Sequence, residues 1–172
     1  MKIFVQGMWH CGCVISACLS SIKHEVTAYD DDKKTINNLK KKITPIYEPG
    51  LLELIKSSLQ DKSLTFTNNL NKINSSDIVW FAYDTPVNEK DQANEIIVLD
   101  KIKKSLKKLK SGKLIIISSQ IPVGSTKLLE DYSKFSLKKK FDFYYCPENL
   151  RLGNALQSFL SAERIVVGIR NN

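Results

Sequence analysis

The chain has 172 residues, of which 42% are hydrophobic, and a formal net charge of +8 at pH 7. This length and apolar content suit one compact domain and are too small for two full ones. No apolar run approaches the roughly 20 residues that cross a bilayer, and the apolar start ends at Gly7 without a small-residue cleavage site. We therefore expect one soluble, cytoplasmic domain over residues 1–172, and no membrane partner.

The cysteines do not indicate a disulfide scaffold or a metal centre. Three of the four crowd into one predicted turn and helix, in a chain without a secretory signature. The Cys11-x-Cys13 spacing lacks the two-residue gap of common zinc knuckles, and no second pair of ligands accompanies it. We expect reduced thiols and no bound metal. The four are Cys11, Cys13, Cys18 and Cys146.

The positive charge does not by itself indicate nucleic-acid binding. The lysines gather in two places: between residues 101 and 110, along one predicted helix, and in one loop, residues 138–140. No aromatic side chains interleave with the first cluster to stack on bases. A solvated, lysine-rich face explains the pattern better. We expect no nucleic-acid partner.

Short β-branched runs alternate with longer helical patterns, which predicts a parallel sheet covered by helices. Strands are expected at residues 2–6, 25–29, 64–67, 77–83, 113–118, 141–145 and 164–168. Helices are expected at residues 12–22, 33–41, 51–59, 96–109, 126–135 and 155–160. The fold class is α/β: a doubly wound, mostly parallel sheet of the Rossmann type, which binds ligands beyond the carboxyl ends of its strands.

A glycine-rich turn follows the first predicted strand. Gly7 and Gly12 occupy the first and third glycine positions of G-x-G-x-x-G, a turn whose amides and helix dipole hold a diphosphate. Trp9 stands at the second position, so its indole must either swing outward or obstruct a cofactor. The predicted cofactor contacts in this turn are Gly7, Met8, Trp9, His10, Cys11 and Gly12.

Asp30 ends the second predicted strand, where a carboxylate accepts hydrogen bonds from a ribose 2′-hydroxyl and repels a 2′-phosphate. This favours NAD over NADP as the cofactor. The alternative is that Asp30, Asp31 and Asp32 only cap the following helix.

Three later loops also leave the carboxyl ends of strands. For the first two, a ligand role and a plain turn role remain open. Their predicted cofactor contacts are Tyr83, Asp84, Thr85, Pro86, Ser119 and Gln120. In the third loop, Glu148 is the best acid–base candidate, with an ordinary surface carboxylate as the alternative. His10 has no evident partner in the sequence, and His24 lies away from this edge.

The ordered loops resemble the N-terminal domain of the UDP-glucose/GDP-mannose dehydrogenase family. The resemblance covers residues 1–168. Its most specific matches are Pro45-Ile46-Tyr47-Glu48-Pro49-Gly50-Leu51, Thr85-Pro86, Ile121-Pro122-Val123-Gly124 and Pro147-Glu148 with Leu150-Arg151. Phe159 and Arg164-Ile165-Val166-Val167-Gly168 also fit the pattern.

The resemblance implies an enzyme that oxidises the C6 hydroxyl of a nucleotide sugar to a carboxylate with two NAD molecules. Glu148 and a water-bridged Gln120 would serve catalysis. The substrate loop would comprise Glu148, Asn149, Leu150 and Arg151. The family's nucleophilic cysteine, central helix and sugar-nucleotide domain have no counterpart here, so we expect a fragment or truncated homologue that is inactive alone. The full-length protein would be a homo-oligomer that meets its nucleotide sugar through the missing half.

Several positions depart from the family pattern, and they support alternative interpretations. Trp9 replaces a glycine, and Gln120 replaces a threonine. Asn149 replaces an aromatic residue, and Leu152 replaces a glutamate. Asp84 replaces a small or amide residue. These changes favour a degenerate module that binds a nucleotide or another subunit without catalysis. A third interpretation is an NAD-linked dehydrogenase of β-hydroxy acids, in which the Tyr-Glu-Pro-Gly loop has no place.

Overall fold

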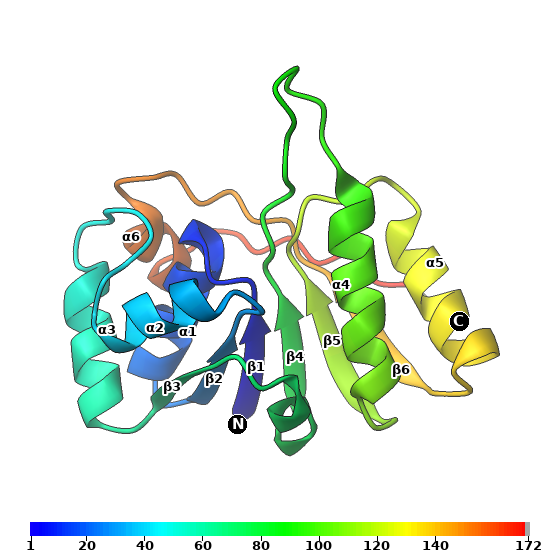
Figure 1. The fold of residues 1–172 in the computed structure, drawn as a ribbon, viewed down its shortest axis with the longest axis horizontal. Helices are drawn as coiled ribbons and strands as arrows, with labels where there is room; N and C mark the ends of the chain where they lie inside the picture. The colour runs from blue at the N-terminus through cyan, green and yellow to red at the C-terminus, as the bar shows by residue number, and fades with distance from the viewer. Residues whose placement is uncertain (171–172) are drawn as a thin grey trace.

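The computed structural model describes residues 1–170, which form one six-stranded, fully parallel sheet (Figure 1). The strand order is β3-β2-β1-β4-β5-β6. The strands are β1 (Lys2–Gln6), β2 (Glu25–Tyr29), β3 (Leu64–Thr67), β4 (Ile78–Phe81), β5 (Lys113–Ile117) and β6 (Phe141–Tyr145). This order, which reverses between β1 and β4, is that of dinucleotide-binding sheets.

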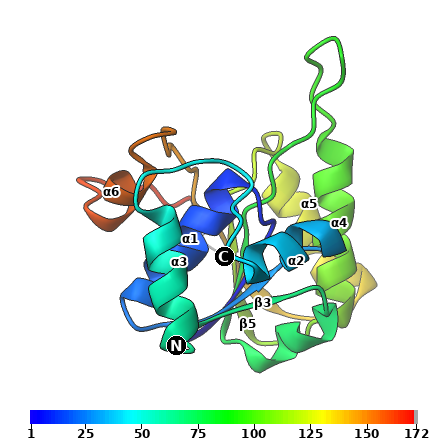
Figure 2. The same cartoon turned by 60° about the vertical axis from the view of Figure 1, so that its left-hand side comes forward.

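Helices cover both faces of the sheet. They are α1 (His10–Ser21), α2 (Lys33–Lys40), α3 (Leu51–Gln60), α4 (Glu95–Lys108), α5 (Ser125–Asp131) and α6 (Ala155–Leu160). A 3₁₀ turn (Leu70–Ser75) precedes β4, and a π turn (Tyr132–Ser136) extends α5. Figure 2 shows α1, α3 and α6 together on one side of the sheet and α4 and α5 on the other.

The alternation of side chains along β1 explains why the core has two parts. Ile3 and Val5 belong to the buried cluster under α1, α3 and α6. Phe4, between them in sequence, belongs to the opposite cluster under α4 and α5. Successive residues of a strand point to opposite faces, so a central strand buried on both faces is apolar throughout. The sheet is therefore held from both sides.

The predicted strand at residues 164–168 is wrong. The segment forms a single antiparallel bridge, between Tyr145 and Gly168, rather than a strand. Ile165 and Val166 are 71% and 53% exposed. β-Branched residues fit a pleated, half-buried surface, and their preference for strands depends on a partner that buries one side. Here the segment meets β6 at one point only.

The other predicted elements are confirmed, some with the predicted bounds and the rest with shifted ends. β4 is shorter than residues 77–83, and the helix predicted at 126–135 is α5 followed by the π turn. Among the described residues, no helix is long and apolar enough to cross a membrane. The loops that follow β1, β4, β5 and β6 all leave the same edge of the sheet, because the strands are parallel and adjacent.

Candidate active site

The turn after β1 is too tight for side chains at its two glycines. Gly7 has φ +96°, and a Cβ there would lie 2.7 Å from the backbone nitrogen of Tyr83. A Cβ on Gly12 would lie 1.7 Å from the carbonyl oxygen of Gly7. Only glycine allows this backbone conformation and this approach of α1 to the strands. The structure thus forms the predicted turn at its predicted place.

The first amides of α1 are available to a ligand. The first amides of a helix have no intrahelical acceptor, and within residues 1–170 those of Trp9, His10, Cys11 and Gly12 reach no acceptor. The first turn of α1 carries no acidic residue. Together with the helix dipole, these amides suit an anion such as a diphosphate. The residues present therefore fit NAD at this end of α1.

Trp9 lies at the position before α1 and does not enter the core. Its side chain is 51% exposed, and it belongs to neither buried cluster. It makes no side-chain capping bond to α1. The indole therefore lies half in solvent, outside the packed core.

Asp30 faces the glycine turn, whereas Asp32 caps the next helix. One carboxylate oxygen of Asp30 accepts from the amide of Met8 at 2.7 Å, and the other accepts from the amide of Asp32 at 2.9 Å. Asp32 is the residue that caps α2, by accepting from Lys34 and Thr35. A carboxylate has about four acceptor positions, so Asp30 retains capacity for a ribose hydroxyl. Burial raises the pKa of Asp30.

The loops after β4 and β5 are joined to each other. The hydroxyl of Thr85 donates to the carbonyl oxygen of Gln120 at 2.6 Å. The hydroxyl of Ser119 is buried and has no partner within residues 1–170. Burial raises the pKa of Asp84. The structure therefore brings these predicted residues together at one edge of the sheet.

Tyr83 points into the core rather than toward the carboxyl edge of the sheet. Its side chain is 7% exposed, and its hydroxyl donates to Gln6 at 3.1 Å. Ser105 of α4 donates to the same oxygen of Gln6 at 2.8 Å. Sequence reasoning missed this buried polar group, because a glutamine at the end of an apolar strand gives no signal of its partners. Its amide nitrogen has no partner among the described residues.

Glu148 has the environment of an acid–base residue. One of its carboxylate oxygens is buried without a hydrogen-bond partner within residues 1–170. Burial raises the pKa of Glu148 to about 7. Of the other residues in the loop, Leu150 packs against the core under α1, whereas Asn149 and Arg151 are exposed. Such a carboxyl can exchange a proton near neutral pH.

The thiols near this edge are held in the protonated form. Burial raises the pKa of Cys11, and the nearby carboxyl of Glu148 raises it further. Burial also raises the pKa of Cys13, and it raises that of Cys18 to about 12. A thiol must lose its proton to act as a nucleophile. These three cysteines are therefore packing residues.

His10 has a partner that the sequence did not reveal. Its Nε2 lies 2.8 Å from a carboxylate oxygen of Glu48, whose side chain is almost completely buried. The two residues lie 38 positions apart in sequence. Glu48 belongs to the Tyr-Glu-Pro-Gly segment, the most specific motif in the chain. A motif this specific in a loop indicates that the loop makes tertiary contacts, and this was the only signal in the sequence for the pair.

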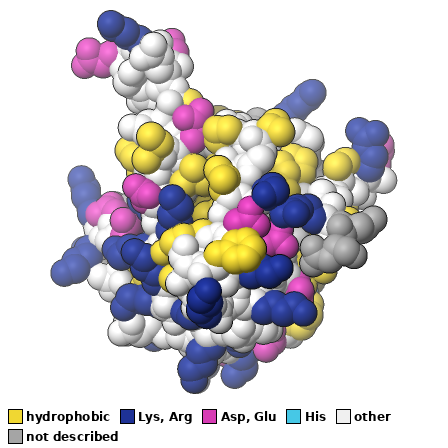
Figure 3. All heavy atoms as spheres, turned by 90° about the vertical axis from the view of Figure 1, so that its right-hand side faces the viewer, with side chains coloured by type: hydrophobic (Ala, Val, Ile, Leu, Met, Phe, Trp, Pro, Cys, Tyr) yellow, Lys and Arg dark blue, Asp and Glu magenta, His cyan; other side chains and the backbone are white. Residues whose placement is uncertain are grey.

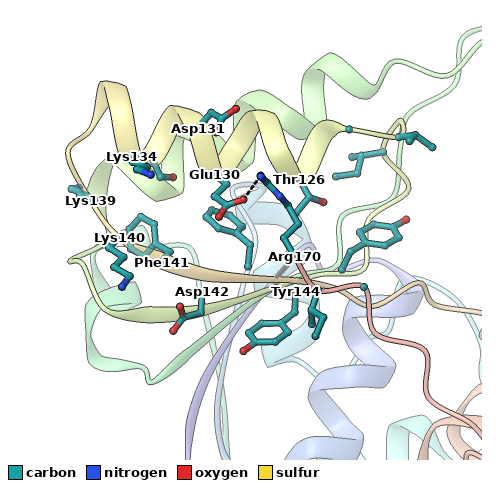
Figure 4. A pocket seen from close by; sticks show the side chains of 18 of the residues that line it. Thr126, Glu130, Asp131, Lys134, Lys139, Lys140, Phe141, Asp142, Tyr144 and Arg170 are labelled. Atoms are coloured by element: carbon teal, nitrogen blue, oxygen red, sulfur yellow. Dashed lines mark hydrogen bonds and ion pairs between the residues drawn. The ribbon is translucent and has the colours of Figure 1, made fainter. Parts of the chain in front are cut away.

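A large cavity lies away from the predicted site. A groove of about 1120 Å³ runs between α5 with its π turn and β6 (Figure 4). Charged side chains line it, and Arg170 crosses to pair with Glu130. It contains none of the predicted site residues. The cofactor turn lies instead at the open carboxyl edge of the sheet, between α1 and the loop after β4.

On the face that carries α5, the basic charge is dispersed rather than gathered at one site. Figure 3 shows lysine and arginine side chains scattered over the face that carries α5, with apolar and acidic side chains between them. Two lysines of α4 have local partners: Lys101 pairs with Asp31, and Lys108 donates to Asn71. These contacts agree with a solvated helix face.

Comparisons with known proteins place the chain in a family. The sequence profile of the UDP-glucose/GDP-mannose dehydrogenase family, NAD binding domain, matches residues 1–172. UDP-glucose 6-dehydrogenase TuaD of Bacillus subtilis is 35% identical over 97% of this chain. UDP-glucose 6-dehydrogenase of Rickettsia typhi is 37% identical over 99% of it. The chain spans 37% and 39% of the lengths of these two relatives.

Solved structures agree on the fold. A UDP-glucose dehydrogenase from Pyrobaculum islandicum superimposes with a TM-score of 0.87 at 26% identity. It is matched over 99% of this chain and 41% of that one. A GDP-mannose dehydrogenase from Pseudomonas aeruginosa gives a TM-score of 0.90 at 23% identity, over 99% of this chain and 41% of that one. The predicted fold, family and NAD cofactor are confirmed. The chain belongs to the UDP-glucose/GDP-mannose dehydrogenase family and corresponds to its NAD-binding domain.

Proposed function

We propose that the turn between Gly7 and Gly12 receives the diphosphate of NAD, that Asp30 binds the adjacent ribose, and that the complete protein oxidises a nucleotide sugar such as UDP-glucose at C6. The observation that carries the proposal is the turn itself. It leaves no room for a Cβ at either glycine and presents unbonded helix amides beside a carboxylate. This combination suits a dinucleotide rather than a single anion.

Glu148 acts in this proposal as the acid–base residue. Because its pKa is about 7, a useful fraction is ionised near neutral pH and can take the proton of the sugar hydroxyl. Gln120 assists through a bridging water, and Thr85 holds the backbone of Gln120 in place. When bound, NAD supplies the hydride acceptor. Asn149, Leu150 and Arg151 orient the sugar nucleotide on the same loop.

The 172 residues alone bind NAD without completing the oxidation. Oxidation of an alcohol to a carboxylate by the family's covalent route needs a nucleophilic thiol, and the raised pKa values of Cys11, Cys13 and Cys18 suit them poorly to that role. We propose that the choice of sugar nucleotide and the assembly into a homo-oligomer depend on other parts of the protein.

Calorimetric titration with NAD tests the proposal on the chain itself. We expect Asp30→Asn to weaken binding by about tenfold or more, since a hydrogen bond to a charged group contributes about 1.5–3 kcal/mol. The same substitution removes the charge that repels a 2′-phosphate, so the preference for NAD over NADP falls as well.

Asp32→Asn is the matched control, because it removes the same charge and asparagine still caps α2. Its affinity for NAD should stay near that of the wild type. Absence of binding by the wild-type chain at millimolar NAD would contradict the proposal.

A further inference from the structure

Glu48 connects two segments that lie far apart in the sequence. It is only 4% exposed, and three donors reach its carboxylate. One oxygen accepts from His10 Nε2 at 2.8 Å and from the amide of Gly153 at 2.8 Å. The other accepts from the amide of Ala155 at 2.9 Å. Both oxygens of this buried carboxylate accept hydrogen bonds, so its position is strongly fixed.

The surrounding backbone makes Glu48 rigid. The amide of Leu51 donates to the carbonyl oxygen of Glu48 at 3.1 Å as α3 begins. Gly50 adopts φ +79°, and a Cβ there would lie 3.2 Å from Leu156 of α6. Burial alone would raise the pKa of Glu48, but the hydrogen bonds from Gly153, His10 and Ala155 hold it below its ordinary value. Glu48 is thus a charged acceptor in a fixed place.

The contact with His10 reaches the cofactor turn. His10 is the first residue of α1, whose free amides face the expected diphosphate. Because Glu48 accepts at Nε2, that ring nitrogen carries the hydrogen, and the ring cannot rotate without losing the bond. The ring also lies near Asp84, whose pKa it lowers against the larger raising effect of burial. His10 therefore links the cofactor turn to Glu48 by a direct contact.

The contacts with Gly153 and Ala155 reach the loop that carries Glu148. Ala155 is the first residue of α6, and the amide of Asn154 donates to the carbonyl oxygen of Arg151 at 3.1 Å. Leu150 packs against the core beneath α1. Glu48 thereby holds the end of the loop at Gly153 and Ala155. One carboxylate oxygen of Glu148, earlier in the same loop, has no partner within residues 1–170. Glu148 and this anchor lie in the same loop, between β6 and α6.

We propose that Glu48 is a positioning residue that couples the cofactor turn to the Glu148 loop, so that NAD bound at the turn orders residues 148–155 through His10 and Glu48. This inference rests on the proposed function, since it takes the turn as the NAD site and the loop as the catalytic one. It assigns a role to the Tyr-Glu-Pro-Gly motif, which contributes no atom to the cofactor turn itself.

Amide hydrogen exchange with and without NAD tests the coupling on the 172-residue chain. In the wild type, NAD should slow exchange in residues 149–155, at Gly153 and Ala155 above all, by about fivefold or more. In Glu48→Gln the amide group cannot accept all three donors, so this slowing should be lost and NAD affinity should fall by a similar factor. A merely structural role would change exchange equally with and without NAD.

Glu53→Gln is the matched control, because Glu53 is exposed on α3 and the substitution removes the same charge nearby. It should behave as the wild type does. If Glu48→Gln does not fold, His10→Ala provides the same test, since it leaves the loop anchored and cuts only the link to the turn. In His10→Ala, NAD should then slow amide exchange in the cofactor turn but not in residues 149–155.

Two failures are distinguishable. If the wild type binds NAD and the slowing at residues 149–155 is absent, or persists in Glu48→Gln and His10→Ala, the coupling is wrong and the proposed function stands. If the wild type binds no NAD, the proposed function is wrong, and the coupling falls with it.

Discussion

Gly12 lies where α1 meets the end of β1, and a side chain has no room there. Its Cβ would overlap the carbonyl oxygen of Gly7, at 1.7 Å. The obstacle is backbone, which cannot move aside as a flexible side chain can. We expect Gly12→Ala to lower the free energy of unfolding by about 1–3 kcal/mol or more, the range of overpacking, in urea denaturation.

Gly168→Ala is the control for that experiment. A Cβ there would lie 3.6 Å from its nearest neighbour, an ordinary contact, and Gly168 does not have a positive φ. Its unfolding midpoint should match that of the wild type. Equal stability of Gly12→Ala and Gly168→Ala would show that the turn is not as closely packed as the structure has it.

Glu148 gives the chain a dependence of stability on pH. Burial raises its pKa from 4.5 to about 7 in the folded state, so the folded state binds its proton more tightly than the unfolded state does. This contribution to stability is complete below pH 4.5 and is lost as the pH rises through about 7. Glu148→Gln should therefore lose less stability than the wild type between pH 5 and pH 7.5.

Urea denaturation midpoints of the wild type and Glu148→Gln, measured across that pH range, test this prediction. Other buried acids also titrate, and the difference between the two proteins isolates the part due to Glu148. Parallel curves for wild type and variant would mean that Glu148 is solvated like an ordinary surface carboxylate.

At the scale of elements, three neighbouring strands are tied together at the candidate site. The indole nitrogen of Trp80, in β4, donates to the hydroxyl of Ser118 at 2.8 Å. That hydroxyl donates in turn to the carbonyl oxygen of Cys146, directly after β6, at 2.7 Å. Ser118 is only 6% exposed. The chain of bonds holds the loop before Glu148 against the centre of the sheet.

Ser118→Ala should be destabilising by about 1 kcal/mol, because it removes the partner of the Trp80 indole N–H and of the Cys146 carbonyl, both only partly buried. Chemical denaturation measures the effect. Ser57→Ala, on the exposed side of α3, should be neutral or slightly stabilising, since alanine favours a helix. If both variants unfold at the wild-type midpoint, water replaces the serine hydroxyl at no cost.

At the scale of the whole molecule, the described surface includes an apolar stretch beside the edge strand β6. Ile165, Val166, Val167 and Ile169 are 71%, 53%, 46% and 62% exposed. Contiguous exposed apolar residues beside an open strand edge promote association. We expect the chain to self-associate weakly at high concentration, as measured by light scattering.

A double substitution, Ile165→Lys with Val167→Lys, should reduce that association, because lysines near an edge oppose strand pairing. Its unfolding midpoint should stay near that of the wild type, since both side chains are exposed. A wild-type chain that is strictly monomeric at high concentration would contradict this prediction.

The sequence by itself determined the α/β fold, the position of the glycine turn and the place of Asp30. These follow from local patterns: the alternation of strands and helices, glycines at fixed spacing, and a carboxylate at the end of a strand. The same local reasoning left open whether Asp30 caps a helix. It also predicted a strand at residues 164–168, because β-branched residues signal a strand without revealing whether a partner exists.

Only the tertiary structure decided which side chains meet. It assigned the capping role to Asp32, turned Tyr83 into the core and paired His10 with Glu48. It also brought Gly153 and Ala155 to the same carboxylate, more than a hundred residues along the chain. Such contacts depend on how strands order themselves in the sheet and on which loops then share an edge. No local pattern encodes them, because each partner's sequence signal ends within a few residues of its own element.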